Sequence, residues 1–224
     1  MRIIITGGTG LIGRALSQAL VEKGHDVTVL SRNPIEAKPM SEGVHMHRWD
    51  GKTAEGWGHL VDGADAIINL DVANLGDHLW TKAYKKEIRD SRIDAGNAVM
   101  EAIRAAEEKP DVLIQGSAVG YYPSDTSDTE YTEESRIGND FMAKVLFDGE
   151  ISTAAASRMG IRRPIIRTAP VFSNDAAVYK RLKLPFSFFI GGKLGNGEQW
   201  MSWIHMEDEV RAILFLLENE AADG

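Results

Sequence analysis

Hydrophobic residues in this chain form short strand-like runs that alternate with longer amphipathic stretches. The first run, Arg2–Thr6, is apolar and rich in β-branched residues, which is typical of a strand buried on both faces. From Leu11 onwards, apolar residues recur at helical spacing as far as Gly24. The same patterns predict strands at 25–31, 43–49, 64–70, 111–115, 163–167 and 200–205, and helices at 85–107, 140–159, 177–182 and 208–218.

This alternation of strands with helices predicts the fold class. Parallel strands need crossover connections, which are usually helices and are almost always right-handed. The pattern therefore predicts an α/β fold with a doubly wound, mostly parallel sheet of the Rossmann type. The alternation stops near residue 168, because residues 169–199 are rich in glycine, proline and aromatic residues and predict mainly loops. We therefore expect a Rossmann core over 1–168 and a partial substrate-side segment over 169–224 that packs on it.

Composition and charge narrow the classes of function. The 224 residues include no cysteine, which excludes disulfides, thiolate catalysis and cysteine-based metal sites, and we predict no metal site. A net charge of −8 argues against broad binding to a nucleic-acid backbone. One basic stretch, Lys85, Lys86, Arg89 and Arg92, is expected on the solvated outer face of its helix. Since no apolar run is long enough to cross a bilayer, we expect a soluble, cytoplasmic protein without a membrane partner.

The first strand is followed by the glycine-rich turn TGGTGLIG. Glycines also gather in turns for purely structural reasons, but here a strand ends at Thr6 and a helix begins near Leu11. Gly7 permits the tight turn, Gly10 lets the backbone approach a pyrophosphate, and Gly13 lets the helix lie close to the sheet. The N–H groups and the dipole of the helix start favour phosphate. We therefore predict a dinucleotide site, with a structural turn as the alternative.

The end of the second strand bears on the choice of cofactor. NAD binders usually place a carboxylate there, which accepts a hydrogen bond from the ribose 2′-hydroxyl and repels a 2′-phosphate. This strand ends instead in Ser31 followed by Arg32. An arginine can bind a phosphate through two parallel hydrogen bonds, and a serine can donate to it. The sequence therefore favours NADP(H) over NAD(H), with Arg32 as a solvated loop residue in the alternative interpretation.

Four segments of the chain resemble a known family: 4–14, 68–80 (INLDVANLGDHLW), 116–122 (GSAVGYY) and 191–208 (GGKLGNGEQWMSWIHMED). They are similar to the extended short-chain dehydrogenases/reductases, and within these to the atypical branch called the epimerase family, of the NAD-dependent epimerase/dehydratase superfamily. The resemblance implies a Rossmann core, bound NADP(H), and a substrate cleft over the carboxyl ends of the strands. The cofactor-binding residues that we predict are Gly7, Thr9, Gly10, Leu11, Ile12, Gly13, Ser31, Arg32 and Leu70.

The same resemblance identifies what is missing at the reaction centre. The superfamily uses a Tyr-x-x-x-Lys pair on the helix after the fifth strand, with a serine or threonine at the end of that strand. Ser117 occupies the serine position, but the predicted helix at 140–159 contains no Tyr-x-x-x-Lys. Tyr121 and Tyr122 follow Ser117 closely enough to reach a cleft. We predict Ser117 and Tyr121 as catalytic residues, with packing as the alternative role of the tyrosine.

Two further features depart from the branch that the chain resembles. Its members usually carry two small residues after the fourth strand, where this chain has Asp71 and Val72. A carboxylate beside a pyrophosphate costs Coulomb energy unless a cation or a rotamer turned away relieves it. Relatives also continue for some tens of residues past the position of Asn219, whereas this chain ends at Gly224. We therefore expect a reduced or incomplete C-terminal substrate lobe.

Two classes of function follow from these patterns. The first is an NADP(H)-dependent oxidoreductase or epimerase that acts on a small polar substrate without the Tyr-x-x-x-Lys pair, with Ser117 orienting the substrate oxygen. The alternative is a non-catalytic NADP(H)-binding protein that senses the cofactor or docks a partner. A homodimer formed through the helices at 85–107 and 140–159 is a further expectation, because extended short-chain enzymes often pair in this way.

Overall fold

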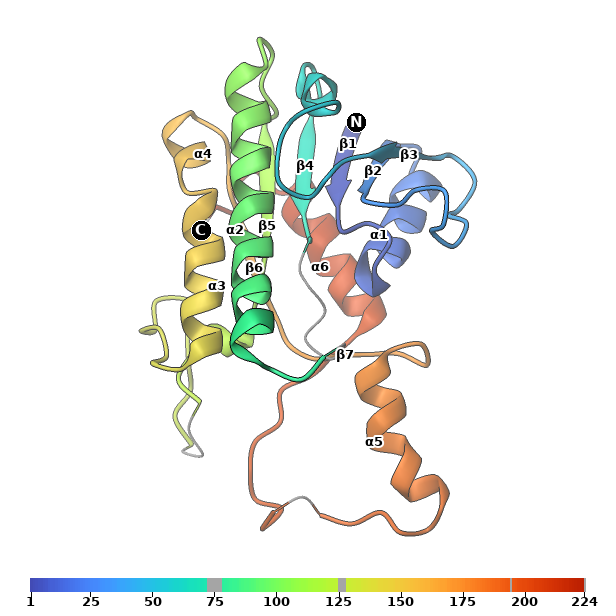
Figure 1. Cartoon of the computed structure of the whole chain (residues 1–224), viewed down its shortest axis with the longest axis vertical. Helices are drawn as coiled ribbons and strands as arrows, with labels where there is room; N and C mark the ends of the chain where they lie inside the picture. Colours follow the sequence, from blue (N-terminus) through green and yellow to red (C-terminus); the bar gives the residue numbers. More distant parts are fainter. Residues whose placement is uncertain (72–77, 125–127, 194, 224) are drawn as a thin grey trace.

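The computed structural model describes residues 1–71, 78–124, 128–193 and 195–223. Within them, a parallel sheet of six strands has the order β3-β2-β1-β4-β5-β6 (Figure 1). The strands are β1 (Arg2–Thr6), β2 (Asp26–Ser31), β3 (Val44–Arg48), β4 (Ala66–Asn69), β5 (Val112–Ala118) and β6 (Ile165–Thr168). The strand order reverses between β1 and β4, and ligands bind beyond the carboxyl ends of the strands at such a point. The predicted doubly wound, Rossmann-type fold is confirmed.

Helices cover both faces of this sheet (Figure 1). α1 (Leu11–Glu22) and α6 (Met206–Glu218) cover one face, and α2 (Lys82–Ala105) with α3 (Phe141–Ser152) covers the other. Short 3₁₀ turns follow at η1 (Gly58–Val61) and η2 (Val119–Tyr121). None of the described helices is both long and apolar enough to span a membrane.

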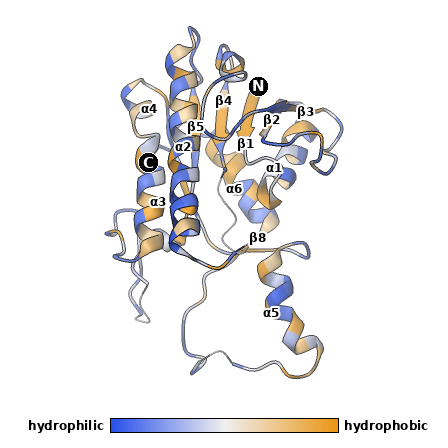
Figure 2. Ribbon diagram, in the orientation of Figure 1, coloured by the Kyte–Doolittle hydropathy of each residue, from blue (hydrophilic) through white to orange (hydrophobic). Residues whose placement is uncertain are grey.

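The central strand β1 contributes to the apolar core on both faces of the sheet. Ile3 and Ile5 pack with residues of α1 and α6, whereas Ile4 packs with residues of α2. This division follows from the period of a strand, in which successive side chains point to opposite faces. Figure 2 shows β1 and β4 in hydrophobic colours, while the outer helices mix polar and apolar residues. The apolar first run of the sequence is therefore the centre of the core.

Most predicted elements agree with the structure to within a few residues, and three differ more clearly. The helix expected at 140–159 is broken into α3 and a short α4 (Ala155–Arg158). The break coincides with the buried Thr153, whose hydroxyl donates to the Gln115 side chain on β5 at 3.1 Å. The strand expected at 200–205 is only β8 (Ile204–His205), and the helix expected at 177–182 extends further, as α5 (Ala177–Ser187).

The C-terminal segment contains one part that joins the core and one that does not. α6 packs in the same apolar cluster as α1, through residues such as Ile213 and Leu217. α5 contains no buried residue, and Figure 1 shows it projecting from the body of the molecule beyond the pairing of β7 (Val171–Phe172) with β8. The large exposed hydrophobic side chains between residues 177 and 203 are Val178, Leu184, Phe186, Phe188, Phe189, Ile190, Trp200, Met201 and Trp203. The division of the chain after residue 168 stays a prediction.

Candidate functional site

A row of buried polar side chains connects the carboxyl ends of the central strands. Thr6 on β1 donates its hydroxyl to Asn69 Oδ1 on β4 at 2.6 Å. Asn69 Nδ2 donates to Gln115 Oε1 on β5 at 3.0 Å, and that oxygen also accepts from Thr153. Buried polar groups that satisfy one another in this way fix the relative positions of the strand ends. The residues that follow these strands are therefore attached to strand ends whose relative positions are fixed.

The glycine-rich turn fits tightly between β1, β4 and α1. Gly7 has a φ of +66°, and a Cβ atom there would lie 2.6 Å from the carbonyl oxygen of Leu70. A Cβ atom on Gly13 would lie 2.5 Å from Gly8 Cα, so α1 also contacts the turn directly. Gly10 is the N-cap residue of α1 and has no side chain that could accept from the N–H groups of the first turn. This backbone geometry is that of a phosphate cradle.

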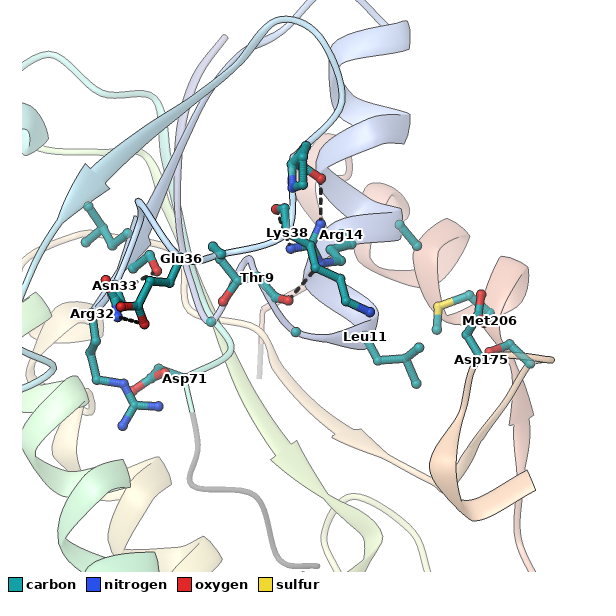
Figure 3. Close-up of a pocket in the computed structure, with 18 of the residues that line it drawn as sticks. Thr9, Leu11, Arg14, Arg32, Asn33, Glu36, Lys38, Asp71, Asp175 and Met206 are labelled. Carbon is teal, nitrogen blue, oxygen red and sulfur yellow. Dashed lines mark hydrogen bonds between the residues drawn. The ribbon is translucent and has the colours of Figure 1, made fainter. Parts of the chain in front are cut away.

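A cavity of about 1060 Å³ opens beside this turn, comparable with the largest ligand pockets of proteins (Figure 3). Six predicted cofactor-binding residues line it: Gly7, Thr9, Gly10, Leu11, Ser31 and Arg32. The other three, Ile12, Gly13 and Leu70, are not among its lining residues. Leu70 and Gly13 nevertheless contact the glycine turn, as described above. The structure therefore brings the glycine turn and the end of β2 to one cavity.

Arg14 is a residue of this cavity that the sequence analysis did not identify. Its Nε donates to the Thr9 carbonyl at 2.9 Å, within the glycine turn. Its two terminal nitrogens donate to the carbonyls of Lys38 and Pro39, at 2.8 and 2.9 Å (Figure 3). A positive charge in the first turn of a helix interacts unfavourably with the helix dipole. The three carbonyl partners of Arg14 compensate for this position. One guanidinium thus holds the glycine turn and the loop after β2 together.

Ser31 and Arg32 lie at the end of β2, on the wall of the same cavity. Ser31 is buried and its Oγ accepts from the Asn33 N–H at 3.3 Å. Arg32 is exposed, and its guanidinium points toward Asp71 (Figure 3). Lys38 also lines the cavity, as does Glu36, whose carboxylate accepts from Asn33 Nδ2. The end of β2 therefore offers cations and a hydroxyl to a ligand, with one acid that is already hydrogen-bonded.

The structure also accounts for Asp71, the acid expected to disfavour a pyrophosphate. Burial raises the pKa of this carboxyl, while the positive charges of Arg32 and Arg92 act in the opposite direction. Burial lowers the pKa of Arg92 to about 10, against the effect of Asp71, so this arginine keeps its charge at neutral pH. The two cations thus offset the effect of burial on this carboxyl only in part. Val72, the other substituted position, lies outside the described residues.

The expected outer position of Arg92 is wrong. Arg92 is buried on α2, and its Nη1 donates to the Ile88 carbonyl at 3.2 Å. It lies four residues after Ile88 and three before Ala95, so it shares their inward face. Lys86 and Arg89 are exposed as expected, and the basic stretch is therefore divided between two faces of the helix.

On the other side of the sheet's carboxyl edge, Ser117 at the end of β5 belongs to a side-chain network. Its hydroxyl donates to Glu150 Oε1 on α3 at 2.6 Å. Both oxygens of Glu150 also accept from Arg167 on β6, each at 3.0 Å. The two charged side chains are only 7% and 16% exposed. The sequence analysis missed Glu150 and Arg167. The signal that identifies them is a buried charge pair on two facing elements.

Arg167 continues the network to the two tyrosines after Ser117. The guanidinium carbon lies 3.6 Å from the ring centroid of Tyr121, and Nη1 donates to the Tyr122 hydroxyl at 3.0 Å. Tyr122, but not Tyr121, lines a second cavity of about 450 Å³. That cavity lies at the start of α3, and its other lining residues are Trp80, Val119, Gly120, Pro123, Ser124, Asp140, Phe141 and Met142.

The fold and the glycine turn define a Rossmann-type protein of the short-chain dehydrogenase/reductase class. The model of the NAD dependent epimerase/dehydratase family matches residues 3–224, and the chain belongs to this family. An epimerase family protein of Staphylococcus saprophyticus is 38% identical over 222 residues, which are 99% of this chain and 72% of that protein. The expected membership of the epimerase family branch is confirmed.

Two solved structures agree with this assignment. The human epimerase family protein SDR39U1 (isoform 2), crystallised with NADPH, is 30% identical with a TM-score of 0.83. The match covers 97% of this chain and 70% of the human one. A nucleoside-diphosphate sugar epimerase from Corynebacterium glutamicum is 33% identical with a TM-score of 0.82, over 100% of this chain and 45% of the other.

Proposed function

We propose that this protein is an NADP(H)-dependent oxidoreductase or epimerase that acts on a small polar substrate without a Tyr-x-x-x-Lys pair. The observation that carries the proposal is the 1060 Å³ cavity, bounded by the uncapped start of α1 and by the cations at the end of β2. The NADPH bound to the human family member supports the choice of cofactor. When bound, the nicotinamide would accept or donate hydride.

The residues present fit such a dinucleotide. The glycine turn leaves no room for side chains at Gly7 and Gly13, and its backbone faces the cavity where a pyrophosphate would lie. Arg32, with Ser31 beside it, would hold the 2′-phosphate of NADP(H). In this proposal Ser117 contacts the reacting oxygen of the substrate. NAD(H) stays the alternative cofactor, and the cytoplasmic location and the homodimer stay predictions.

A titration with NADPH and then NADH, followed by nicotinamide fluorescence and calorimetry, tests this proposal. We expect micromolar NADPH binding and much weaker NADH binding. Arg32→Ala should weaken NADPH binding about tenfold or more and leave NADH unchanged, since a lost charge-assisted hydrogen bond costs about 1.5–3 kcal/mol. Arg211→Ala removes a cation on the exposed face of α6 and serves as the control for net charge. Absence of binding by both cofactors would contradict the proposal.

A second function has one specific observation in its favour. The Ser117 hydroxyl already donates to Glu150 at 2.6 Å, so its hydrogen is engaged within the protein. A non-catalytic NADP(H) sensor or docking protein fits this arrangement. It predicts tight NADPH binding that Ser117→Ala does not change, together with no turnover on a broad panel of carbonyl compounds and sugar nucleotides. Oxidation of NADPH with any member of that panel would favour the enzyme.

A further inference from the structure

One buried ion pair connects Ser117 with Tyr122. Glu150 accepts from the serine hydroxyl, and Arg167, bound to Glu150, donates to the tyrosine hydroxyl. The four side chains come from β5, the turn after it, α3 and β6. They surround the carboxyl end of β5, where the family resemblance places the reacting serine. The position is therefore that of a reaction centre, although α3 contains no Tyr-x-x-x-Lys pair.

The guanidinium of Arg167 is held in a single geometry. It makes two hydrogen bonds to the Glu150 carboxylate, and its carbon lies 3.6 Å from the Tyr121 ring centroid. A planar guanidinium with such partners cannot turn away from the Tyr122 oxygen without breaking several contacts at once. A fixed cation thus faces a phenol oxygen.

Tyr122 belongs both to the network and to the wall of the second cavity. Its ring stacks on Tyr131 with centroids 5.5 Å apart and an interplanar angle of 15°, and it lines the 450 Å³ cavity. Its oxygen accepts from Arg167, so its own hydrogen remains to be donated. Among the described residues, no acceptor is found for that hydrogen. Tyr121, by contrast, presents the face of its ring to the guanidinium.

We propose that Tyr122 is the catalytic proton donor of this protein and that Arg167 is its positioning residue. The inference rests on the proposed function. In the reductive direction, hydride leaves C4 of the reduced nicotinamide with its electron pair and bonds to the carbonyl carbon of the substrate. The C=O π pair moves to oxygen, which takes the hydroxyl proton of Tyr122. The products are an alcohol and the oxidised cofactor, and the phenolate beside Arg167 then takes a proton from water.

This assignment moves the acid role from Tyr121 to its neighbour, and the two tyrosines form a matched pair for kinetics. Tyr122→Phe and Tyr121→Phe each keep the aromatic ring and remove one hydroxyl. With NADPH and 4-nitrobenzaldehyde as the probe, Tyr122→Phe should lower kcat at least 100-fold and leave KM and the NADPH Kd unchanged. Tyr121→Phe should change kcat less than threefold. Equal losses in both variants, or a larger loss in Tyr121→Phe, would overturn the inference.

A second measurement needs neither substrate nor cofactor. Tetranitromethane nitrates accessible tyrosine rings, and mass spectrometry of peptides measures the rate at each tyrosine. The Arg167 guanidinium covers the Tyr121 ring, whereas Tyr122 lines the second cavity. We expect Tyr122 to react at least tenfold faster than Tyr121. Arg167→Lys keeps a cation and should retain part of this difference. The double variant Glu150→Gln/Arg167→Met removes both charges of the pair and the guanidinium over the Tyr121 ring, and it should abolish the difference.

The two measurements separate the failure of this inference from that of the proposed function. Without NADPH binding, the proposed function fails, whatever the nitration rates are. If NADPH binds but Tyr122 reacts no faster than Tyr121, or reacts equally fast in the double variant, the inference fails and the proposed function stands. If 4-nitrobenzaldehyde is not reduced, the nitration ratio decides.

Discussion

The two halves of the sheet's carboxyl edge hold their functional groups by different means. Around β1 and α1, the cavity is bounded by a backbone turn whose glycines leave no room for a Cβ atom at Gly7 and Gly13. Around β5, α3 and β6, the functional groups are side chains arranged on the ion pair between Glu150 and Arg167. The first half therefore depends on the space available to the backbone. The second depends on charge and hydrogen bonding.

The largest expected effect comes from breaking the charge pair of the second half. Arg167→Met leaves Glu150 buried without its partner, and we expect the free energy of unfolding to fall by about 3–5 kcal/mol. Adding Glu150→Gln should recover most of this loss, because no buried charge then remains. Arg89→Met, which breaks the more exposed pair with Asp148, should cost less than about 1 kcal/mol. Urea denaturation measures all three, and equal losses in the single and double variants would contradict the charge argument.

Gly7→Ala tests the backbone half of the comparison. The new Cβ atom would lie 2.6 Å from the Leu70 carbonyl oxygen at a φ of +66°, so clash and backbone strain together should cost about 2–4 kcal/mol. NADPH binding should be lost as well. The control is Gly24→Ala, where φ is +83° but no atom lies within 4 Å of the Cβ position. Its cost should be about 1 kcal/mol. Similar Tm values for the two variants would mean that the turn relaxes.

The smallest expected effect concerns Glu209, a buried acid that accepts from Thr168 at the end of β6 at 2.7 Å. Burial raises the pKa of Glu209, and the hydrogen bond from Thr168 opposes this only in part. A folded-state pKa above the unfolded value favours the folded protein most at low pH, and this contribution is lost as the pH rises through the folded pKa. The Tm of Glu209→Gln relative to the parent protein should therefore increase between pH 4.5 and pH 7. A difference independent of pH would contradict the assignment.

The same comparison explains which parts of the molecule could be predicted from sequence. The glycine turn is continuous in sequence. The glycines between Thr6 and Gly13 are therefore enough to indicate its backbone geometry. The network beyond β5 joins Ser117, Glu150 and Arg167, which lie 33 and 17 residues apart. Hydrophobic periodicity contains no information about such partners. Arg92 is an exception: its spacing of four residues from Ile88 predicts the inner face of α2, where the structure has it, although we expected it on the outer face from the charge pattern.

The predicted bounds of one helix were wrong for a related physical reason. Thr153 and Gln115 are polar residues whose hydrogen bond, between α3 and β5, coincides with a break in a helix that the apolar pattern alone would continue. Likewise, the offset of Asp71 by Arg32 and Arg92 depends on positions that are distant in sequence. Local pattern therefore recovered the order of the main elements and the glycine-rich turn between β1 and α1, whereas the polar contacts between elements required coordinates. The cofactor-binding role of that turn stays a prediction.

Arg14 has a consequence for redesigning the cofactor preference. The loop after β2, which faces the cofactor ribose in Rossmann folds, is bound at Lys38 and Pro39 by a side chain from α1. A loop grafted from an NAD-dependent relative would inherit its ribose-facing residues but not this attachment. Position 14 and the loop at 32–39 should therefore be exchanged together. A graft that includes both keeps the loop after β2 in its place relative to the glycine turn.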